Sequence, residues 1–203
     1  LFKGLSPWMQ RLPGGLIHVN VVGCALFAAI SGSSAATVAT VGKMSIPELR
    51  KRNYPEKILL GSLAGSGTLG LLIPPSIILI IYGVAVQESI AKLFIAGIIP
   101  GIMIALIFMS YVIIWSLINK KEMPKIIEEY SFLEKIKRSK QLLPVIILIF
   151  AVIGSIYTGI ATATEAASLG VVGALILSYL QKSLTLKTFK SSLLGATKTS
   201  CMI

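Results

Sequence analysis

The sequence has little charge, little cysteine and no aspartate, since all eight of its acidic residues are glutamate. Only 13% of its 203 residues are charged and 55% are hydrophobic, which excludes intrinsic disorder and argues against an ordinary soluble domain. Cys24 and Cys201 lie far apart in apolar or terminal surroundings, so neither a disulfide framework nor a cysteine metal motif is supported. The composition indicates a membrane protein.

Long uncharged runs are what the sequence does contain. Residues 12–42, 58–87 and 93–119 carry no Lys, Arg or Glu, and residues 141–181 carry only Glu165. Each run exceeds the roughly 20 residues that a helix needs to cross a bilayer, and the last is long enough for two crossings. The sequence therefore predicts an all-α integral membrane protein.

The 19 basic residues outnumber the acidic ones and give a net charge of +11. All but Lys92 gather in four segments, at residues 1–15, 43–57, 120–140 and 182–198, and they form no stripe with interleaved aromatic residues. Nucleic acid is therefore not an expected partner. The positive-inside rule predicts that all four basic segments lie on the cytoplasmic side.

This topology conflicts with a simple spanning helix over the first apolar run, because its two basic flanks would then lie on opposite faces. A re-entrant hairpin over residues 16–42 removes the conflict. Its centre, residues 28–37, is nearly all small or hydroxylic, which suits a tight turn between packed helices. Arms of about 14 residues would reach only about 21 Å into a core of about 30 Å, so we expect the tip near mid-membrane.

The second run predicts a broken helix over residues 58–83. It contains Ile73-Pro74-Pro75-Ser76, and tandem prolines remove two amide donors and push the preceding residue out of helical geometry. Unwound backbone is tolerated at membrane depth only where protein buries it or where it lines a watery cavity. The break therefore indicates a functional site.

The remaining segments complete the predicted topology. Residues 93–119 form a crossing, residues 141–181 form two, and residues 1–15, 43–57 and 182–203 lie at the cytoplasmic side, with 43–57 as a basic loop. In residues 120–140, apolar side chains recur at helical spacing, which favours an amphipathic interfacial helix over a solvated loop. These side chains are Ile126, Ile127, Tyr130, Leu133 and Ile136.

The hairpin tip, Ser31-Gly32-Ser33-Ser34, and the break, Pro74-Pro75-Ser76, share one property: both free backbone carbonyls, amides and hydroxyls near mid-membrane. Half-helix N-termini favour a carboxylate, and carbonyls and half-helix C-termini coordinate a hard cation such as Na⁺. The alternative is that the small residues of the hairpin serve packing alone.

Three other features carry weaker signals. The GxGxxG pattern from Gly65 to Gly70 lies in an apolar run without a crossover helix after it, so we interpret Gly61 and Gly65 as sites of close helix packing. His18 has no orienting partner, which favours a polar residue at a helix end over a protease histidine. Glu165, beside Thr164, is either an intramembrane functional acid or a residue of the outer turn.

Several motifs together resemble the large permease subunit of tripartite ATP-independent periplasmic (TRAP) transporters. They lie at residues 27–37, 46–48, 67–76, 81–83 and 92–101, and residues 162–167 are similar to a later motif of the family, although Ala163 stands where the family often has Pro. The resemblance extends from about Gly14 to Gly173. The family's large subunit is longer, and its second hairpin would lie beyond Ile203, so we expect a partial chain.

The resemblance implies one half of an inverted-repeat, elevator-type transporter, in which residues 141–181 begin the second half. It implies no enzyme and no cofactor, but Na⁺-coupled uptake of carboxylates such as C4-dicarboxylates or sialic acid across the bacterial or archaeal inner membrane. The implied partners are a periplasmic substrate-binding protein and a small four-helix membrane subunit. Two alternatives stay open: a Na⁺-coupled anion permease of another elevator family that needs no binding protein, and a structural membrane fragment that transports nothing.

Carried onto this sequence, the resemblance implies two overlapping sets of site residues at the tip and the break. The implied substrate contacts are Ser31, Gly32, Ser33, Ser34, Pro75 and Ser76. The implied Na⁺ contacts, mostly through backbone carbonyls, are Ser33, Ser34, Gly70, Ile73 and Pro74. Thr164 and Glu165 are further candidates without an assigned role.

Overall fold

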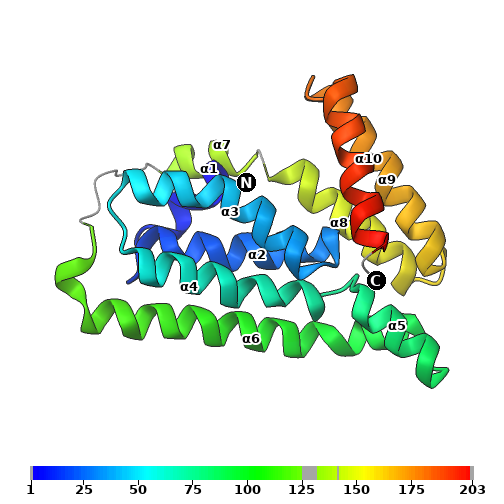
Figure 1. Cartoon of the computed structure of the whole chain (residues 1–203), viewed down its shortest axis with the longest axis horizontal. Helices are drawn as coiled ribbons and strands as arrows, with labels where there is room; N and C mark the ends of the chain where they lie inside the picture. Colours follow the sequence, from blue (N-terminus) through cyan, green and yellow to red (C-terminus); the bar gives the residue numbers. More distant parts are fainter. Residues whose placement is uncertain (1, 125–131, 141, 202–203) are drawn as a thin grey trace. The chain divides into compact units, whose positions relative to one another are not determined.

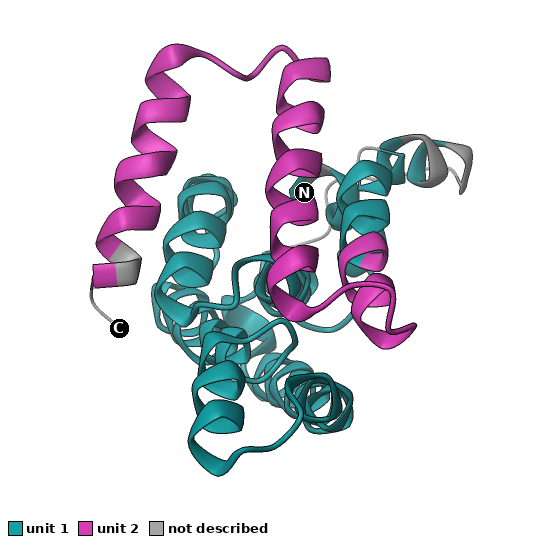
Figure 2. Cartoon of the chain, turned by 90° about the vertical axis from the view of Figure 1, so that its right-hand side faces the viewer, with its two compact units in different colours: residues 1–149 teal, residues 150–203 magenta. Residues whose placement is uncertain are grey.

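A computed structural model describes residues 2–124, 132–140 and 142–201, and every regular element in these ranges is a helix (Figure 1). The predicted all-α class is thus confirmed. The chain divides into two compact units, Leu1–Ile149 and Phe150–Ile203, coloured separately in Figure 2. Each unit is described by itself.

The first unit is built around three helices that pack on one another, α2, α3 and α4, with α6 alongside α2 and α4 (Figure 1). Its buried side chains form apolar clusters between these helices. The elements of the unit, in chain order, are α1 (Phe2–Met9), η1 (Gly15–Ile17), α2 (His18–Ser31), α3 (Ser34–Lys51), α4 (Glu56–Gly67), η2 (Thr68–Leu71), α5 (Ile77–Val86), α6 (Ile90–Ile118), η3 (Lys120–Glu122), α7 (Phe132–Ser139) and the start of α8 (Leu143–Tyr157).

Helices α2 and α3 form a hairpin whose turn is Gly32-Ser33. Gly32 has a φ of 60° and closes α2, and Ser33 is extended and caps α3, because its side chain accepts from the amide of Ala36. At the base of the hairpin, the hydroxyl of Tyr54 accepts a hydrogen bond of 3.0 Å from the amide of Leu16. The two arms are therefore held at both ends.

The second arm differs from the prediction, because α3 continues to Lys51, well inside the range 43–57 that was expected to be a loop. The buried positions Thr37, Val41, Ser45 and Leu49 recur every four residues, so one face of the helix continues to pack beyond residue 42. Pro47 lies on the exposed side of the same helix. Tertiary packing thus overrides the polar, proline-containing sequence.

The chain is not helical between η2 and α5, at the tandem prolines. Pro74 and Pro75 are joined by a cis peptide bond. Ser76, fully buried, caps α5 by accepting from the amide of Leu79, and it donates to the carbonyl of Leu71. The hydroxyl of Ser76 thus forms hydrogen bonds on both sides of the tandem prolines.

Two of the described helices are long and apolar enough to cross a bilayer, α6 and α9 (Ala163–Leu180). Residues 15–31 and helices α5 and α8 are shorter apolar helices. With 14 residues, α2 spans only about 21 Å, less than a hydrocarbon core of about 30 Å. The re-entrant position of the hairpin in a membrane stays a prediction.

The predicted interfacial helix over 120–140 is described only in part. Residues 125–131, which include Ile126, Ile127 and Tyr130, lie outside the described residues. Helix α7 packs against α1, where the indole nitrogen of Trp8 donates to Ser139 Oγ at 2.8 Å and Lys135 Nζ lies 5.7 Å from the Trp8 ring centre. Membrane contact of this segment stays a prediction.

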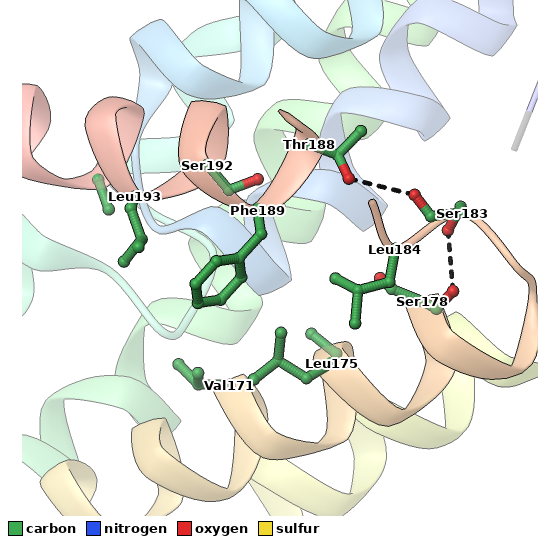
Figure 3. A pocket seen from close by; sticks show the side chains of 11 residues that line it. Val171, Leu175, Ser178, Ser183, Leu184, Thr188, Phe189, Ser192 and Leu193 are labelled. Atoms are coloured by element: carbon green, nitrogen blue, oxygen red, sulfur yellow. Dashed lines mark hydrogen bonds between the residues drawn. The ribbon is translucent and has the colours of Figure 1, made fainter. Parts of the chain in front are cut away.

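The second unit contains the end of α8, then α9 and α10 (Leu186–Cys201). The turn between α8 and α9 includes Gly159, with a φ of 72°. Helices α9 and α10 face each other across a mostly apolar groove of about 570 Å³, into which Phe189 and Leu193 of α10 and Val171 and Leu175 of α9 point (Figure 3). Most of the described residues after 182 belong to α10.

Candidate functional site

The hairpin tip and the helix break, which the sequence marks separately, lie against each other. The amide of Ile77, at the start of α5, donates to the carbonyl of Gly32 at 3.3 Å. A Cβ on Gly32 would lie 2.6 Å from the carbonyl oxygen of Pro75, and the φ of 60° is strained for any other residue. We call this contact the tip–break joint.

A second glycine brings η2 against the other side of the tip. A Cβ on Gly70 would lie 2.8 Å from the carbonyl carbon and oxygen of Ser33 and 2.9 Å from the amide of Ser34. The structure therefore brings together predicted site residues from two segments, around Gly32, Ser33, Gly70 and Pro75. Their roles in binding stay predictions.

Two glycines of α6 lie in close contact with the residues just before the tandem prolines. A Cβ on Gly97 would lie 2.9 Å from the carbonyl oxygen of Leu72, and a Cβ on Gly101 would lie 2.9 Å from the side chain of Ile73. Neither glycine was predicted from the sequence to pack against the break. Their small-xxx-small spacing is the signal that could have done so.

Most hydroxyls at the tip and the break are already engaged within the protein. Ser31 Oγ lies 2.9 Å from Thr37 Oγ1, and Thr37 Oγ1 donates to the carbonyl of Ser33 at 2.7 Å. Ser33 and Ser76 cap α3 and α5 with their side chains. The arrangement thus offers a ligand chiefly backbone groups and helix ends.

The helix ends give the site its electrostatic character. The N-termini of α3 and α5 begin at the tip and the break, and α2 ends at the tip. N-termini carry partial positive charge and C-termini partial negative charge. Since residues 12–42 and 58–87 contain no Lys, Arg or Glu, this arrangement can attract both an anion and a cation without a charged side chain of its own.

Several buried polar residues of α2, α3 and α4 were not predicted from the sequence. Asn20, Thr37, Ser45, Ser62 and Ser66 are all buried. Their signal is positional: Thr37 and Ser45 recur on the buried face of α3, and Ser62 and Ser66 are one turn apart in α4.

The weaker motifs resolve into structural roles. His18 is the first residue of α2, where its Nε2 lies 2.7 Å from the carbonyl oxygen of Pro13, about 20 Å along the helix from Ser31. Gly65 and Gly67 are in α4, and a Cβ on Gly65 would lie 3.1 Å from the ring of Phe108, so its predicted close packing is present. The same prediction is wrong for Gly61 within the described part of the chain, where no atom lies within 4 Å of a Cβ placed on it.

Glu165 lies in the second unit and is exposed. Thr162 caps α9, and the Oε2 of Glu165 accepts from the amide and the hydroxyl of Thr162, both at 2.8 Å. This is a capping box, whose Thr-x-x-Glu signature was present in the sequence. Thr164 accepts a hydrogen bond from Ser168 through its carbonyl and otherwise takes no part in the arrangement.

Comparison with known proteins gives consistent matches. Residues 7–203 match the family model of the tripartite ATP-independent periplasmic transporter, DctM component. The C4-dicarboxylate TRAP transporter large permease protein DctM of Pseudomonas aeruginosa is 37% identical over 194 residues, which cover 95% of this chain and 45% of that protein.

Relatives with other names are about as similar. The sialic acid TRAP transporter permease protein SiaT of Haemophilus influenzae is 37% identical over 97% of this chain and 32% of its own length. The ectoine/5-hydroxyectoine TRAP transporter large permease protein UehC of Ruegeria pomeroyi is 36% identical over 89% of this chain and 41% of its own length. The chain spans about half the length, or less, of these relatives.

Proposed function

This chain belongs to the DctM family of TRAP transporter components, and we propose that it supplies one half of the site through which such a permease takes up a carboxylate with Na⁺. The family consists of transporter permeases and not of enzymes. Membership also sets aside a permease of another elevator family.

The observation that carries the proposal is the tip–break joint. Two interrupted helical segments, far apart in sequence, meet through the hydrogen bond from the amide of Ile77 to the carbonyl of Gly32. A structure that used the small residues of the hairpin only for packing has no need for a non-helical segment pressed against the tip. Broken helices that meet in this way are typical of substrate and ion sites in secondary transporters.

The Na⁺ half of the proposal rests on oxygen atoms near the joint. A hard cation takes oxygen ligands, and the backbone of Ser33, Ser34, Gly70, Ile73 and Pro74 supplies carbonyls there without any carboxylate. Such a neutral set would bind Na⁺ only modestly, which suits a coupling ion that must also be released.

The substrate half rests on the N-termini of α3 and α5. Ser31, Gly32, Ser33, Ser34, Pro75 and Ser76 would contact the carboxylate chiefly through backbone groups. The names of the relatives include C4-dicarboxylate, sialic acid, ectoine and isethionate. The first three carry a carboxylate, whereas isethionate is a sulfonate, so we propose the carboxylate class, which most of these names share, without choosing among its members.

The proposed assembly follows from the family. The partners are a periplasmic substrate-binding protein and a small four-helix membrane subunit, and the complex would lie in the inner membrane as a multi-pass protein. Transport would proceed by an elevator-like displacement of the hairpin and the break together.

The test is uptake by the complete permease that contains this chain, reconstituted in liposomes with its membrane subunit and binding protein. We expect uptake of a labelled carboxylate to require an inward Na⁺ gradient and the binding protein. Gly70→Ala should raise the Na⁺ concentration for half-maximal uptake at least tenfold, because the new methyl group meets Ser33. The matched control, Gly61→Ala, should leave it unchanged. An uptake rate that is the same with and without the Na⁺ gradient would contradict the proposal.

A further inference from the structure

Three polar side chains lie buried between α2, α3 and α4, away from the tip–break joint. Asn20 of α2 is fully buried, Ser45 of α3 is 1% exposed and Ser62 of α4 is 5% exposed. A buried polar group costs free energy unless it is hydrogen-bonded, so a polar residue at this depth calls for a reason.

The amide of Asn20 bonds α4 at a defined place. Its Nδ2 donates to the carbonyl of Leu59 at 3.1 Å and to Ser62 Oγ at 3.0 Å. Ser62 Oγ in turn donates to the same Leu59 carbonyl at 3.0 Å. Because these bonds are directional and one acceptor is backbone, they fix which turn of α4 faces Asn20, which apolar packing does not do.

Two oxygen atoms of this cluster indicate an enclosed water molecule. Among the described residues, Asn20 Oδ1 and Ser45 Oγ are both buried without a hydrogen-bond partner. Cys24 packs in one cluster with Val41, and Leu16, eight residues earlier, packs in one cluster with Leu49, eight residues later. Because antiparallel helices keep their register, positions 20 and 45 lie at the same level of the hairpin, midway between these two pairs. One water molecule between the two oxygens would satisfy both.

We propose that Asn20 is a positioning residue for the tip–break joint, bonded directly to α4 and, through one enclosed water molecule shared with Ser45, to α3. The inference rests on the proposed function. Gly32 lies twelve residues beyond Asn20, about 18 Å along α2, and Gly70 lies eleven residues beyond Leu59, about 16 Å along α4 and η2. The polar cluster and the joint are thus separated by nearly the same distance along α2 and along α4, so the alignment of these helices at Asn20 also sets their alignment at the joint.

The geometry leaves the joint no room for sliding. A shift of α2 against α4 by one turn moves Gly32 relative to Gly70 by about 5.4 Å, whereas Gly70 already fits against Ser33 with no space for a methyl group. A single buried asparagine is known to fix the register of packed helices at a cost in stability. Asn20 performs this task for the hairpin.

The experiment compares Asn20→Leu with the matched control Val19→Ala in the complete reconstituted permease. Leucine keeps the number and branching of the side-chain heavy atoms but loses the polar contacts, and Val19→Ala removes buried apolar atoms from the cluster that contains Leu49 and Leu59. We expect Asn20→Leu to raise the Na⁺ concentration for half-maximal uptake about tenfold and Ser45→Ala about threefold. Val19→Ala should lower the melting temperature and leave that concentration unchanged.

Hydrogen exchange of the Ile77 amide supplies a readout that needs neither Na⁺ nor transport, because this amide donates to Gly32. It should exchange faster in Asn20→Leu and not in Val19→Ala. A folded Asn20→Leu variant with normal Ile77 exchange and normal Na⁺ dependence would overturn the proposal. If Asn20→Leu does not fold, Ser62→Ala must show the same two effects, only smaller, or the proposal is wrong.

The two proposals fail separately. If uptake by the unmodified permease proves independent of Na⁺, the proposed function fails, and Ile77 exchange alone still decides the role of Asn20.

Discussion

The tip–break joint and the turn before α9 make an instructive pair. Both lie in apolar runs, both contain polar residues that the sequence marks as candidates, and both contain a glycine of positive φ. At the joint, the polar groups contact a segment more than 40 residues away, as Gly32 and Ile77 do. At the α9 turn, Glu165 bonds Thr162, three residues away. The joint thus links two distant segments of the chain through backbone groups, whereas the capping box is a local arrangement at one helix end.

The largest expected difference between the two regions concerns their glycines. Gly32→Ala adds a methyl group 2.6 Å from the Pro75 carbonyl oxygen at a φ of 60°, whereas Gly159→Ala, at a φ of 72°, meets no atom of the described residues within 4 Å. We expect Gly32→Ala to cost about 2–5 kcal/mol and to abolish uptake, and Gly159→Ala to cost only about 1–2 kcal/mol of backbone strain. Thermal unfolding and uptake measure both. Equal losses in the two variants would remove the distinction.

The caps form the second contrast. Ser76→Ala leaves the carbonyl of Leu71 without the hydroxyl that now donates to it and removes the cap of α5, so it should cost about 1–3 kcal/mol and reduce uptake. Thr162→Ala removes an exposed cap and should cost about 1 kcal/mol with normal uptake. Melting temperatures together with initial uptake rates separate the two. Normal uptake by Ser76→Ala would argue against a role for the break.

Thr37→Val tests the hydroxyl network inside the tip with little change of shape. The variant loses the donation from Thr37 Oγ1 to the Ser33 carbonyl and the contact with Ser31, which should cost about 1 kcal/mol. Thr197→Val, on the exposed face of α10, removes a hydroxyl bonded to the Leu193 carbonyl and should change the melting temperature less. A larger loss from Thr197→Val would show that the network does not stabilise the tip.

Glu165→Gln should have the smallest effect. Glutamine also serves in a capping box, and the side chain is exposed. We expect an unchanged melting temperature and an unchanged pH profile of uptake from pH 5 to 8. A clear change of that profile would return Glu165 to the list of functional acids.

Part of this molecule could be predicted from its sequence. The helical class, the helix break at Pro74-Pro75 and the small-residue turn at Gly32 follow from local chemistry, because proline removes donors and glycine permits positive φ. The continuation of α3 to Lys51 could not be predicted locally, since it depends on Leu49 packing against distant residues such as Leu59. The same limit applies to Asn20, whose partner Ser62 is 42 residues away.

The candidate site divides in the same way. Its two halves were recognisable and could be paired as stretches of freed backbone with the same chemistry, and the family resemblance implied that they form one site. The contact of Gly70 with Ser33 and the support from Gly97 and Gly101 depend on distances that no local pattern encodes. The roles of these residues in binding stay predictions.

The hydroxyl of Tyr54 at the base of the hairpin has a consequence for the pH dependence of stability. Burial raises the pKa of this phenol, and its hydrogen bond with the amide of Leu16 lowers the pKa by less. A raised pKa favours the neutral form in the folded state, so its contribution to stability is complete below about pH 10 and declines only as the pH rises through the folded pKa. Tyr54 contacts Leu16 at the base and Ile77 contacts Gly32 at the tip, so one hydrogen bond ties each end of the hairpin to a neighbouring segment. Neither hydrogen bond needs an ionised group, so both persist over the entire physiological pH range.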